Sequence, residues 1–519
     1  MPPERVGSLQ ARSARRAQAP RPALAAACSA VVIALAAAAL ALHSAPLPAA
    51  QPGSAISGRG ALPRPVGRAF LDARVPLNTI AVVVQEIGAP RPLVTHDAAR
   101  PMNPASVMKL YTTLAALELL GRDYRWTTDA YLGGPLVGGT LQGDLVLKGR
   151  GDPKITIEQW QEFMAALRTR GLATVDGDLV LDRTQFALPP HDPTAFDGES
   201  LRPYNVGPDA MLVNFKAVRF QFTPEGRNSA VAIRVDPPLP DVAIAARPLL
   251  AAGDCGDWRA LIAPTWVDQR TSASATFAGR FAAACGERDW YVSLLDHPTY
   301  VHGMFTTYFR AAGGTFDGGL REGRPPRDGT PFAVMQSAPL YYIVRDVNKL
   351  SNNVMARQIF LTLATTKHPP PATTALATDV VQQWLRERKI PVPGLVIENG
   401  SGLSRRERIS ANGLARLLAS ADRSPVREEF VSSLAVAAMD GTVQKRFRDG
   451  TVAGQALLKT GSLEGVRALA GYVIDAEGRR FIVTAIINHP NAARGAPALD
   501  YLVQWVYQEA GHWDPALRH

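Results

Sequence analysis

The sequence of 519 residues predicts a mixed α/β domain of the α+β kind, interrupted by a long and largely β insertion. Three observations indicate this fold class. A β-branched run near residue 80, followed by turn formers, predicts a hairpin, and helical patterns follow near residue 110 and again after residue 340. Three further strand-like runs lie near the end of the chain. Strands on both sides of the helical segments indicate one discontinuous domain whose sheet is completed by the last third of the chain.

The elements are expected in a definite order. The hairpin covers 79–85 and 93–94, and a helix over 107–117 stops at Gly121. Between 122 and 330, short β-like runs with turn signals and a single helix predict an insertion of one or two subdomains. The strands of the insertion are expected at 143–148, 178–182, 218–222, 230–235 and 273–277, and its helix at 157–168. After it we expect helices at 340–348, 353–365, 374–388, 412–421 and 498–510, and strands at 456–460, 466–474 and 481–488.

Residues 1–68 are expected to lie outside the folded domain. Residues 1–22 are rich in Arg and Pro, residues 23–42 carry no charge, and residues 43–68 are rich in Pro and Gly. A basic flank before an apolar stretch is typical of a secretory signal or of a single membrane anchor. We expect export with cleavage within 43–55, and a retained anchor over 23–42 is the alternative. The folded part is then divided into 69–121 with 331–519 as one discontinuous domain and 122–330 as the insertion.

The charge of the chain and the motifs that it lacks argue against several classes of function. The net charge of +10 comes from 47 Arg and 9 Lys against 46 acidic residues, and it includes no block of like charges. Such a diffuse excess does not predict a nucleic-acid partner. The sequence has no Walker loop, no HExxH and no CxxC, so we expect neither a metal nor another cofactor.

Two cysteines, Cys255 and Cys285, follow the expected export segment. An even pair in an oxidising compartment predicts one disulfide that closes a loop of about thirty residues. Two buried thiols are the alternative.

The first motif with chemical meaning is Pro104-Ala-Ser-Val-Met-Lys109. Ser106 and Lys109 are three residues apart at the start of the expected helix, so their side chains lie on one face. A Ser hydroxyl needs a base within hydrogen-bond reach to act as a nucleophile, and a lysine of depressed pKa can be that base. Lys109 is the only one of the nine lysines with a Ser three residues before it. An exposed lysine on an ordinary helix is the alternative.

Two further motifs lie far along the chain. Ser351-Asn352-Asn353 brings a hydroxyl and a carboxamide to the start of a helix. Ser351 could simply cap that helix, as we expect Ser410 to do for the helix at 412–421. Lys459-Thr460-Gly461-Ser462 ends a predicted strand with a cation, two hydroxyls and a glycine, which suits binding of a carboxylate. An ordinary strand end with an exposed lysine is the alternative.

Taken together, S-x-x-K, S-x-N and K-T-G in this order resemble the signature of penicillin-binding proteins and β-lactamases. The intervals of 245 and 108 residues are similar to those of class C low-molecular-mass penicillin-binding proteins, which are D-alanyl-D-alanine carboxypeptidases and endopeptidases. Segments 149–153, 203–209, 348–349, 400–405 and 440–442 also resemble that family, and the resemblance covers about 70–515. It implies a β-lactamase/transpeptidase-like domain with a five-stranded antiparallel sheet flanked by helices, and a disulfide in the insertion.

The resemblance also implies roles for single residues. Ser106 is the expected nucleophile, Lys109 its base, and Ser351 the relay that passes a proton to the leaving amine while bridging the two lysines. The residues expected to bind substrate are Asn353, Lys459, Thr460, Gly461 and Ser462. The implied substrates are peptidoglycan stem peptides in the periplasm or cell envelope, and β-lactams are the implied covalent inhibitors. Two departures from the family, Arg357 in place of a common acid and Asn399 in place of a usual Asp, affect local ion pairs.

Two other functions remain open at this point. A β-lactamase uses the same three motifs, although the interval of 245 residues disfavours it. A non-catalytic scaffold of the cell envelope would instead use the insertion to bind a partner.

Overall fold

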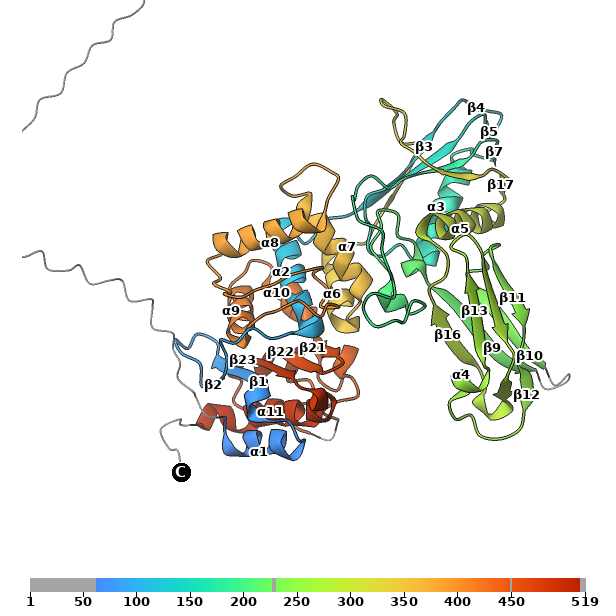
Figure 1. Ribbon diagram of the computed structural model, residues 1–519. Helices are drawn as coiled ribbons and strands as arrows, with labels where there is room; N and C mark the ends of the chain where they lie inside the picture. The colour runs from blue at the N-terminus through green and yellow to red at the C-terminus, as the bar shows by residue number, and fades with distance from the viewer. Residues whose placement is uncertain (1–61, 226–229, 449, 514–519) are drawn as a thin grey trace, which may run out of the picture. The chain divides into compact units, whose positions relative to one another are not determined.

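The computed structural model describes residues 62–225, 230–448 and 450–513. Its central sheet is antiparallel, with six strands in the order β2-β1-β23-β22-β21-β20 (Figure 1). Strand β1 pairs with β23 so that Val82 lies opposite Ala485, which joins the first hairpin to the last strands of the chain. The strands are β1 Ile80–Glu86, β2 Val94–His96, β20 Ala435–Val436, β21 Ala456–Leu463, β22 Val466–Ile474 and β23 Arg480–Asn488. The domain is therefore discontinuous, as its sequence pattern indicates.

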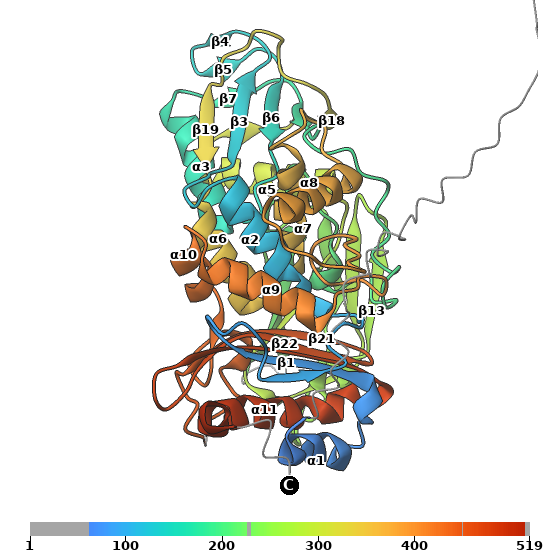
Figure 2. The same ribbon diagram turned by 90° about the vertical axis from the view of Figure 1, so that its left-hand side faces the viewer.

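Helices cover both faces of this sheet (Figure 2). One face packs against α1 Arg64–Asp72 and α11 Ala496–Glu509. The other face packs against α2 Lys109–Leu119 and α9 Ala411–Asp422, and the same core includes α6 Leu340–Leu350, α7 Asn353–Ala364, α8 Thr374–Glu387 and α10 Arg427–Ser432. Because both faces are covered, β1 is apolar without alternation: Val83 belongs to the core under α2, and its neighbours Val82 and Val84 belong to the core over α11.

The insertion begins at β3 Thr127–Leu132 and ends at β19 Ala333–Gln336, and these two strands pair with each other. Its first part has the sheets β18-β8-β6-β3-β19 and β17-β7-β5-β4, with α3 Ile157–Thr169 and α5 His297–Ala311. Its second part has the sheets β10-β9-β16, β11-β14-β13 and β12-β15, with the short helix α4 Trp258–Leu261. Buried side chains of both parts, such as Phe305 of α5 and Phe220 of the second part, belong to one hydrophobic core.

The strands of the insertion are short. Those of the first part are β3, β4 Leu136–Val137, β5 Thr140–Leu141, β6 Leu145–Gly149, β7 Thr174–Val175, β8 Leu179–Asp182, β17 Thr315–Phe316, β18 Leu320–Glu322 and β19. Those of the second part are β9 Val218–Glu225, β10 Ala230–Asp236, β11 Val242–Ala246, β12 Leu249–Ala251, β13 Pro264–Asp268, β14 Ala273–Phe277, β15 Arg280–Ala282 and β16 Arg288–Val292.

Four expectations from sequence need correction. Helix α1 begins inside the predicted linker, because Val66 and Phe70 are fully buried against α11. Strand β19 assigns 333–336 to the insertion and not to the surrounding domain. The sheet has a sixth strand, β20, whose two residues are too few to show a period. Helix α5 was missed because its sequence is rich in β-branched and aromatic residues, although Asp296 caps it and Pro298 occupies its first turn.

The predicted signal or anchor over 23–42 lies outside the described residues. Within the described part of the chain, no helix combines the length and the apolar character needed to cross a membrane.

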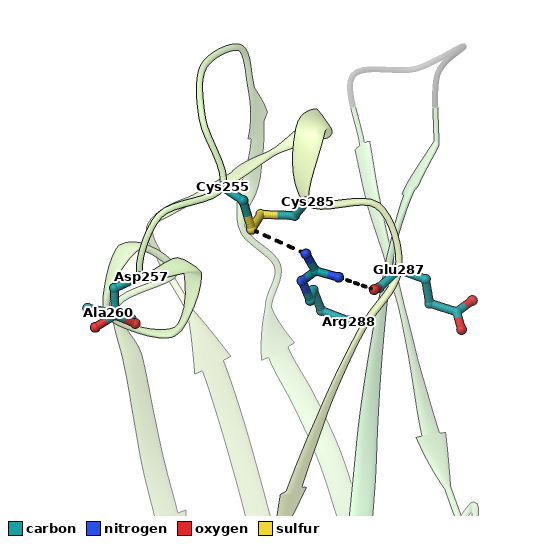
Figure 3. Close-up of a disulfide and its surroundings, with 6 residues drawn as sticks. All are labelled: Cys255, Asp257, Ala260, Cys285, Glu287 and Arg288. Atoms are coloured by element: carbon teal, nitrogen blue, oxygen red, sulfur yellow. Dashed lines mark hydrogen bonds between the residues drawn. A yellow bond between two sulfur atoms is a disulfide. The ribbon is translucent and has the colours of Figure 1, made fainter. Parts of the chain in front are cut away.

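A disulfide joins Cys255 and Cys285 in the second part of the insertion, with their Cα atoms 4.7 Å apart (Figure 3). It links the segment before α4 to the turn before β16. Asp257 caps α4 by accepting the N–H of Ala260, and the guanidinium of Arg288 lies 3.9 Å from the sulfur of Cys255. The bond therefore closes a loop of thirty residues at one end of these small sheets.

Removing this crosslink should destabilise the insertion. Because a loop of this length loses chain entropy when it is closed in the unfolded state, C255A/C285A should lower the free energy of unfolding by about 3–4 kcal/mol. Urea denaturation followed by tryptophan fluorescence measures the change. Wild-type protein kept in reductant should show the same lowered midpoint, and the double variant should not respond to reductant. Equal midpoints for oxidised wild type and variant would contradict this.

Candidate active site

Ser106 lies in a short 3₁₀ turn, Ala105–Met108, that leads directly into α2. The residue before it, Ala105, has a φ of 47°, a strained conformation for a residue with a Cβ. The Asn103 side chain stabilises this turn by accepting the N–H of Ala105 at 2.9 Å. Asn103 is itself bound to Asn488 of β23 through its backbone N–H at 2.8 Å. The sheet thus positions the turn that presents Ser106.

Lys109 lies one helical turn further on, fully buried, with three partners for its amine. Its Nζ lies 3.0 Å from Ser106 Oγ, 2.6 Å from Asn353 Oδ1 and 2.5 Å from the carbonyl oxygen of Ser401. A neutral amine has two N–H bonds and one lone pair. If the two N–H bonds go to the two carbonyl oxygens, which can only accept, the lone pair faces the hydroxyl of Ser106. This is the geometry of a general base beside its nucleophile.

The surroundings of Lys109 favour its neutral form. Burial lowers the pKa of Lys109 well below its ordinary value, the charges of Lys459 and Arg357 lower it further, and Glu407 opposes them. An amine with a lowered pKa is neutral, with a free lone pair, in a larger fraction of molecules at any given pH. Lys109 therefore meets both requirements of a base, position and protonation state.

Ser351 occupies the junction between α6 and α7. It has left-handed backbone with a φ of 59°, which turns the chain sharply at the end of α6. It does not cap α7: Asn352 does so, by accepting the N–H of Met355 at 3.0 Å. Capping thus does not explain Ser351, whereas Ser410 caps α9 as its sequence indicates. The carboxamide of Asn353, at the start of α7, is the one that accepts from Lys109.

Lys459 lies on β21 and, like Lys109, is fully buried. Its Nζ donates to Ser351 Oγ at 2.8 Å and to the carbonyl of Thr460 at 2.9 Å. Burial lowers the pKa of Lys459 to about 7. The hydroxyl of Thr460 is bonded to that of Thr442 at 2.8 Å. The hydrogen bond between Lys459 and Ser351 therefore joins the third motif to the second. The hydrogen bond between Lys109 and Asn353 joins the first motif to the second.

Two glycines allow three segments to meet at Ser106. A Cβ on Gly461 of β21 would lie 2.4 Å from the carbonyl oxygen of Pro104. A Cβ on Gly402 would lie 2.0 Å from the carbonyl oxygen of Ala105, and Gly402 also has a φ of 82°. Any side chain at either position would push its segment away from the turn of Ser106. The glycine of K-T-G thus serves close packing of backbone.

Helix α7, which carries Asn353, is bound to the insertion. The side chain of Gln358 accepts the N–H of Asp209 at 3.0 Å and donates to its carbonyl at 2.7 Å. Arg357 donates to the carbonyl of Val206 at 3.1 Å. Burial lowers the pKa of Arg357 to about 10, and the charge of Glu407 opposes this. Segments 203–209 and 149–153, which the sequence singled out, therefore support the helix of the second motif from the insertion side.

The structure brings all three motifs together, with Gly461 and the exposed Ser462 continuing β21 past the turn of Ser106. One expected detail differs. Ser351 does not bridge the two lysines, because the partners of Lys109 are Ser106, Asn353 and Ser401. Sequence reasoning missed the carbonyl of Ser401, since any residue could supply it, and Glu407, which belongs to no motif. Thr442 was noticed only as part of a similar segment.

Comparison with known proteins finds matches over most of the chain. The family model described as "D-Ala-D-Ala carboxypeptidase 3 (S13) family" matches residues 64–508. A D-alanyl-D-alanine carboxypeptidase of an Actinomadura species is 28% identical over 454 residues, covering 84% of this chain and 82% of the relative.

Solved structures support the fold. The crystal structure of penicillin-binding protein 4 from Haemophilus influenzae matches with a TM-score of 0.71 and 21% identity, over 85% of this chain and 99% of that one. A structure of the same protein complexed with a β-lactam matches with a TM-score of 0.68 and 22% identity over the same shares.

Proposed function

The chain belongs to the D-Ala-D-Ala carboxypeptidase 3 (S13) family, and we propose that it hydrolyses peptidoglycan stem peptides through an ester formed on Ser106. The observation that carries this assignment of residues is the contact of 3.0 Å between Lys109 Nζ and Ser106 Oγ, with the carbonyl oxygens of Asn353 and Ser401 within hydrogen-bond reach of the same amine. The chain is accordingly a serine-type D-Ala-D-Ala carboxypeptidase, and its own side chains and backbone carry out acylation and hydrolysis of the ester.

Acylation begins at Ser106. Lys109 Nζ takes the hydroxyl proton while Oγ attacks the carbonyl between the two D-alanines, and a tetrahedral oxyanion forms. The backbone N–H groups of Ser106 and Ser462 stabilise that oxyanion, a contribution of about 3–4 kcal/mol per donor in enzymes where it has been measured. When the intermediate collapses, the C–N bond breaks and the acyl group remains on Ser106 Oγ.

Ser351 supplies the proton for the leaving amine. Because Lys459 donates to Ser351 Oγ, the hydroxyl proton of Ser351 is free to go to the departing nitrogen. A proton from Lys459 restores Ser351, and D-alanine departs. Lys109 then releases to solvent the proton that it took from Ser106, and Lys459 takes one up from solvent. Neutral Lys109 accepts a proton from the water that attacks the ester, and it returns this proton to Ser106 Oγ when the ester C–O bond breaks.

The substrate is held by its terminal carboxylate. Lys459 supplies the positive charge, and Thr460 and Ser462 supply hydroxyl donors at the end of β21. Asn353 binds the substrate amide, and its carboxamide oxygen also accepts a hydrogen bond from Lys109. A β-lactam mimics the D-Ala-D-Ala end, so it acylates Ser106 and leaves slowly. The β-lactam complex of the Haemophilus influenzae protein, which has the same fold, supports this.

The two alternative functions receive less support. A β-lactamase would share the three motifs. However, the matching family model covers the insertion as well, and it is a model of carboxypeptidases. A non-catalytic scaffold would not need a buried lysine with a lowered pKa beside an accessible serine. Incubation with muropeptides and with a β-lactam, read by mass spectrometry, tests all three functions, because loss of D-alanine, a cleaved cross-link and an opened antibiotic have different masses.

We further propose that the protein is exported to the periplasm or cell envelope. The basic flank of 1–22 and the uncharged stretch of 23–42 support this. The N-terminus of protein recovered from the envelope of an expressing bacterium should lie within 43–55. A full-length chain in the membrane fraction would instead show a retained anchor, and a full-length cytosolic chain would refute export.

Fluorescent penicillin should label the purified protein covalently, and S106A should abolish the label because the attacking oxygen is gone. K109R should be nearly as damaging as K109A, because Arg keeps the charge without the basicity. Gel fluorescence after a timed incubation measures both effects.

Ser432→Ala is the matched control, since Ser432 is exposed on α10 and bonds only to the carbonyl of Glu429 among the described residues. It should label like wild type. Persistent labelling of S106A would show that another residue is the nucleophile, and rapid labelling of K109R would refute the role of Lys109 as base.

The pH profile should report Lys459. Below its pKa of about 7 in the free enzyme, Lys459 carries the charge that binds the substrate carboxylate, and above it that charge is lost. A bound carboxylate raises this pKa. The alkaline limb of kcat/KM, which reports free enzyme, should therefore lie at lower pH than that of kcat, which reports the complex. Steady-state hydrolysis of a D-Ala-D-Ala peptide between about pH 5 and 10 decides this, and coincident limbs would refute it.

A further inference from the structure

Glu407 is a fully buried carboxylate outside the three motifs. It lies in the turn before α9, and its Oε1 accepts three backbone N–H groups, those of Glu398 at 3.1 Å, Asn399 at 3.0 Å and Gly400 at 3.2 Å. Its Oε2 has no hydrogen-bond partner among the described residues. Burying a carboxylate costs free energy unless its charge is compensated, so its neighbours require an explanation.

The loop that Glu407 holds is the one that contacts the base. Within this loop, the carbonyl of Ser401 accepts from Lys109, and the carbonyl of Gly400 accepts from Thr112 of α2 at 2.6 Å. At Gly402 the same loop packs so closely on Ala105 that no side chain fits. The three N–H bonds to Glu407 therefore determine where the carbonyl acceptor of Lys109 lies.

The charges around Glu407 also concern the base. Three cationic groups surround this part of the interior: Lys109 of α2, Arg357 of α7 and Lys459 of β21. The charge of Glu407 acts on Lys109 and on Arg357, and their charges act on Glu407. The other nearby acid, Glu398, turns its side chain to Ser404 and Arg406 instead. Glu407 thus supplies the negative charge that acts on Lys109 against these cations.

This arrangement accounts for both departures from the family pattern. Asn399 stands where Asp is usual, and its Oδ1 accepts the N–H and the hydroxyl of Ser401. Arg357 stands where an acid is common, and its Nε has no partner among the described residues. The residue at position 399 is uncharged and the residue at position 357 is cationic, so the carboxylate whose charge acts on the base is that of Glu407.

We propose that Glu407 is a positioning residue for Lys109: its carboxylate holds the 398–401 backbone so that the Ser401 carbonyl meets the amine, and its charge opposes Lys459 and Arg357. This inference rests on the proposed role of Lys109 as the base. The hydrogen bonds of the Glu407 carboxylate go to backbone N–H groups of the loop and not to Ser106. Glu407 therefore acts on the reaction through Lys109 and this loop.

The direction of its electrostatic effect follows from its neighbours. Burial raises the pKa of Glu407 to about 7, while the N–H bonds and the charges of Lys109 and Arg357 oppose this. Its negative charge raises the pKa of Lys109. Lys109 acts as a base only when it is neutral. Glu407 carries its charge mainly above about pH 7, so Glu407 and Lys109 titrate together. Removing the charge should therefore move the acid limb of the acylation rate to lower pH, by up to about one pH unit.

The experiment measures the second-order rate of acylation by a fluorescent penicillin between about pH 4 and 9 by stopped flow. E407Q keeps the shape of the side chain and an acceptor for the N–H groups, but it lacks the charge. Its acid limb should lie at lower pH than that of wild type, by up to about one pH unit. E407D keeps the charge and should have an acid limb close to that of wild type.

Glu118→Gln is the matched control. Glu118 lies on the same helix as Lys109, about 13 Å along it at 1.5 Å per residue, and accepts from Trp384, Arg388 and Ser424. The same chemical change there should lower the melting temperature without moving the acid limb. A purely structural role of Glu407 would give E407Q this same result.

If E407Q does not fold, N399D/E407Q tests the effect of the charge instead, because it places a carboxylate at position 399, beside the N–H of Ser401. If the folded double variant has its acid limb at the same pH as wild type, the proposal is supported. If its acid limb lies at the lower pH expected without a carboxylate, the proposal is overturned. A folded E407Q with an unmoved limb also overturns it. Failure of wild type to react at all would refute the proposed function itself, which separates the two failures.

Discussion

The structure depends on a buried lysine whose surroundings disfavour its charge. Lys109 has no exposed surface, and the hydroxyl of Ser106 and the carbonyl oxygens of Asn353 and Ser401 surround its amine. A protonated amine at this place would lie in a region that also contains Lys459 and Arg357, which disfavours the charged form. The same burial that costs free energy of folding thus produces the basicity that activates Ser106.

Such a site requires backbone segments to approach more closely than side chains normally permit. Gly402 and Gly461 come from a loop and a strand that are far apart in the sequence, and both press against the turn before Ser106. Ala105, in the turn before Lys109, and Ser351, in the junction between α6 and α7, adopt left-handed backbone. Strained conformations persist only where the surroundings determine them, and here the sheet and α7 do so. The insertion contributes by holding α7 through Gln358.

Much of the fold could be predicted because its elements are amphipathic or uniformly apolar. Helices such as α7 and α8 and strands such as β22 and β23 have the expected bounds within a few residues. Elements whose local signal conflicts with their environment could not be found. Helix α5 is built from residues that favour strands and is helical because Tyr300, Phe305 and Phe309 are buried in the core of the insertion. Helix α1 lies at the end of a Pro-rich and Gly-rich segment, which obscured its pattern.

For the site, the order of residues along the chain specifies the chemistry: which hydroxyl, which amines and which carboxamide are available. Their residue types are sufficient for that, because only lysine combines a strong base with a charge that burial can remove. The orientation of these groups comes from packing between distant segments. The carbonyl of Ser401 reaches Lys109 from almost 300 residues away, and the loop that carries it is held by Glu407 and by its contact with α2. No local pattern records such a contact, because a backbone carbonyl is common to all residues.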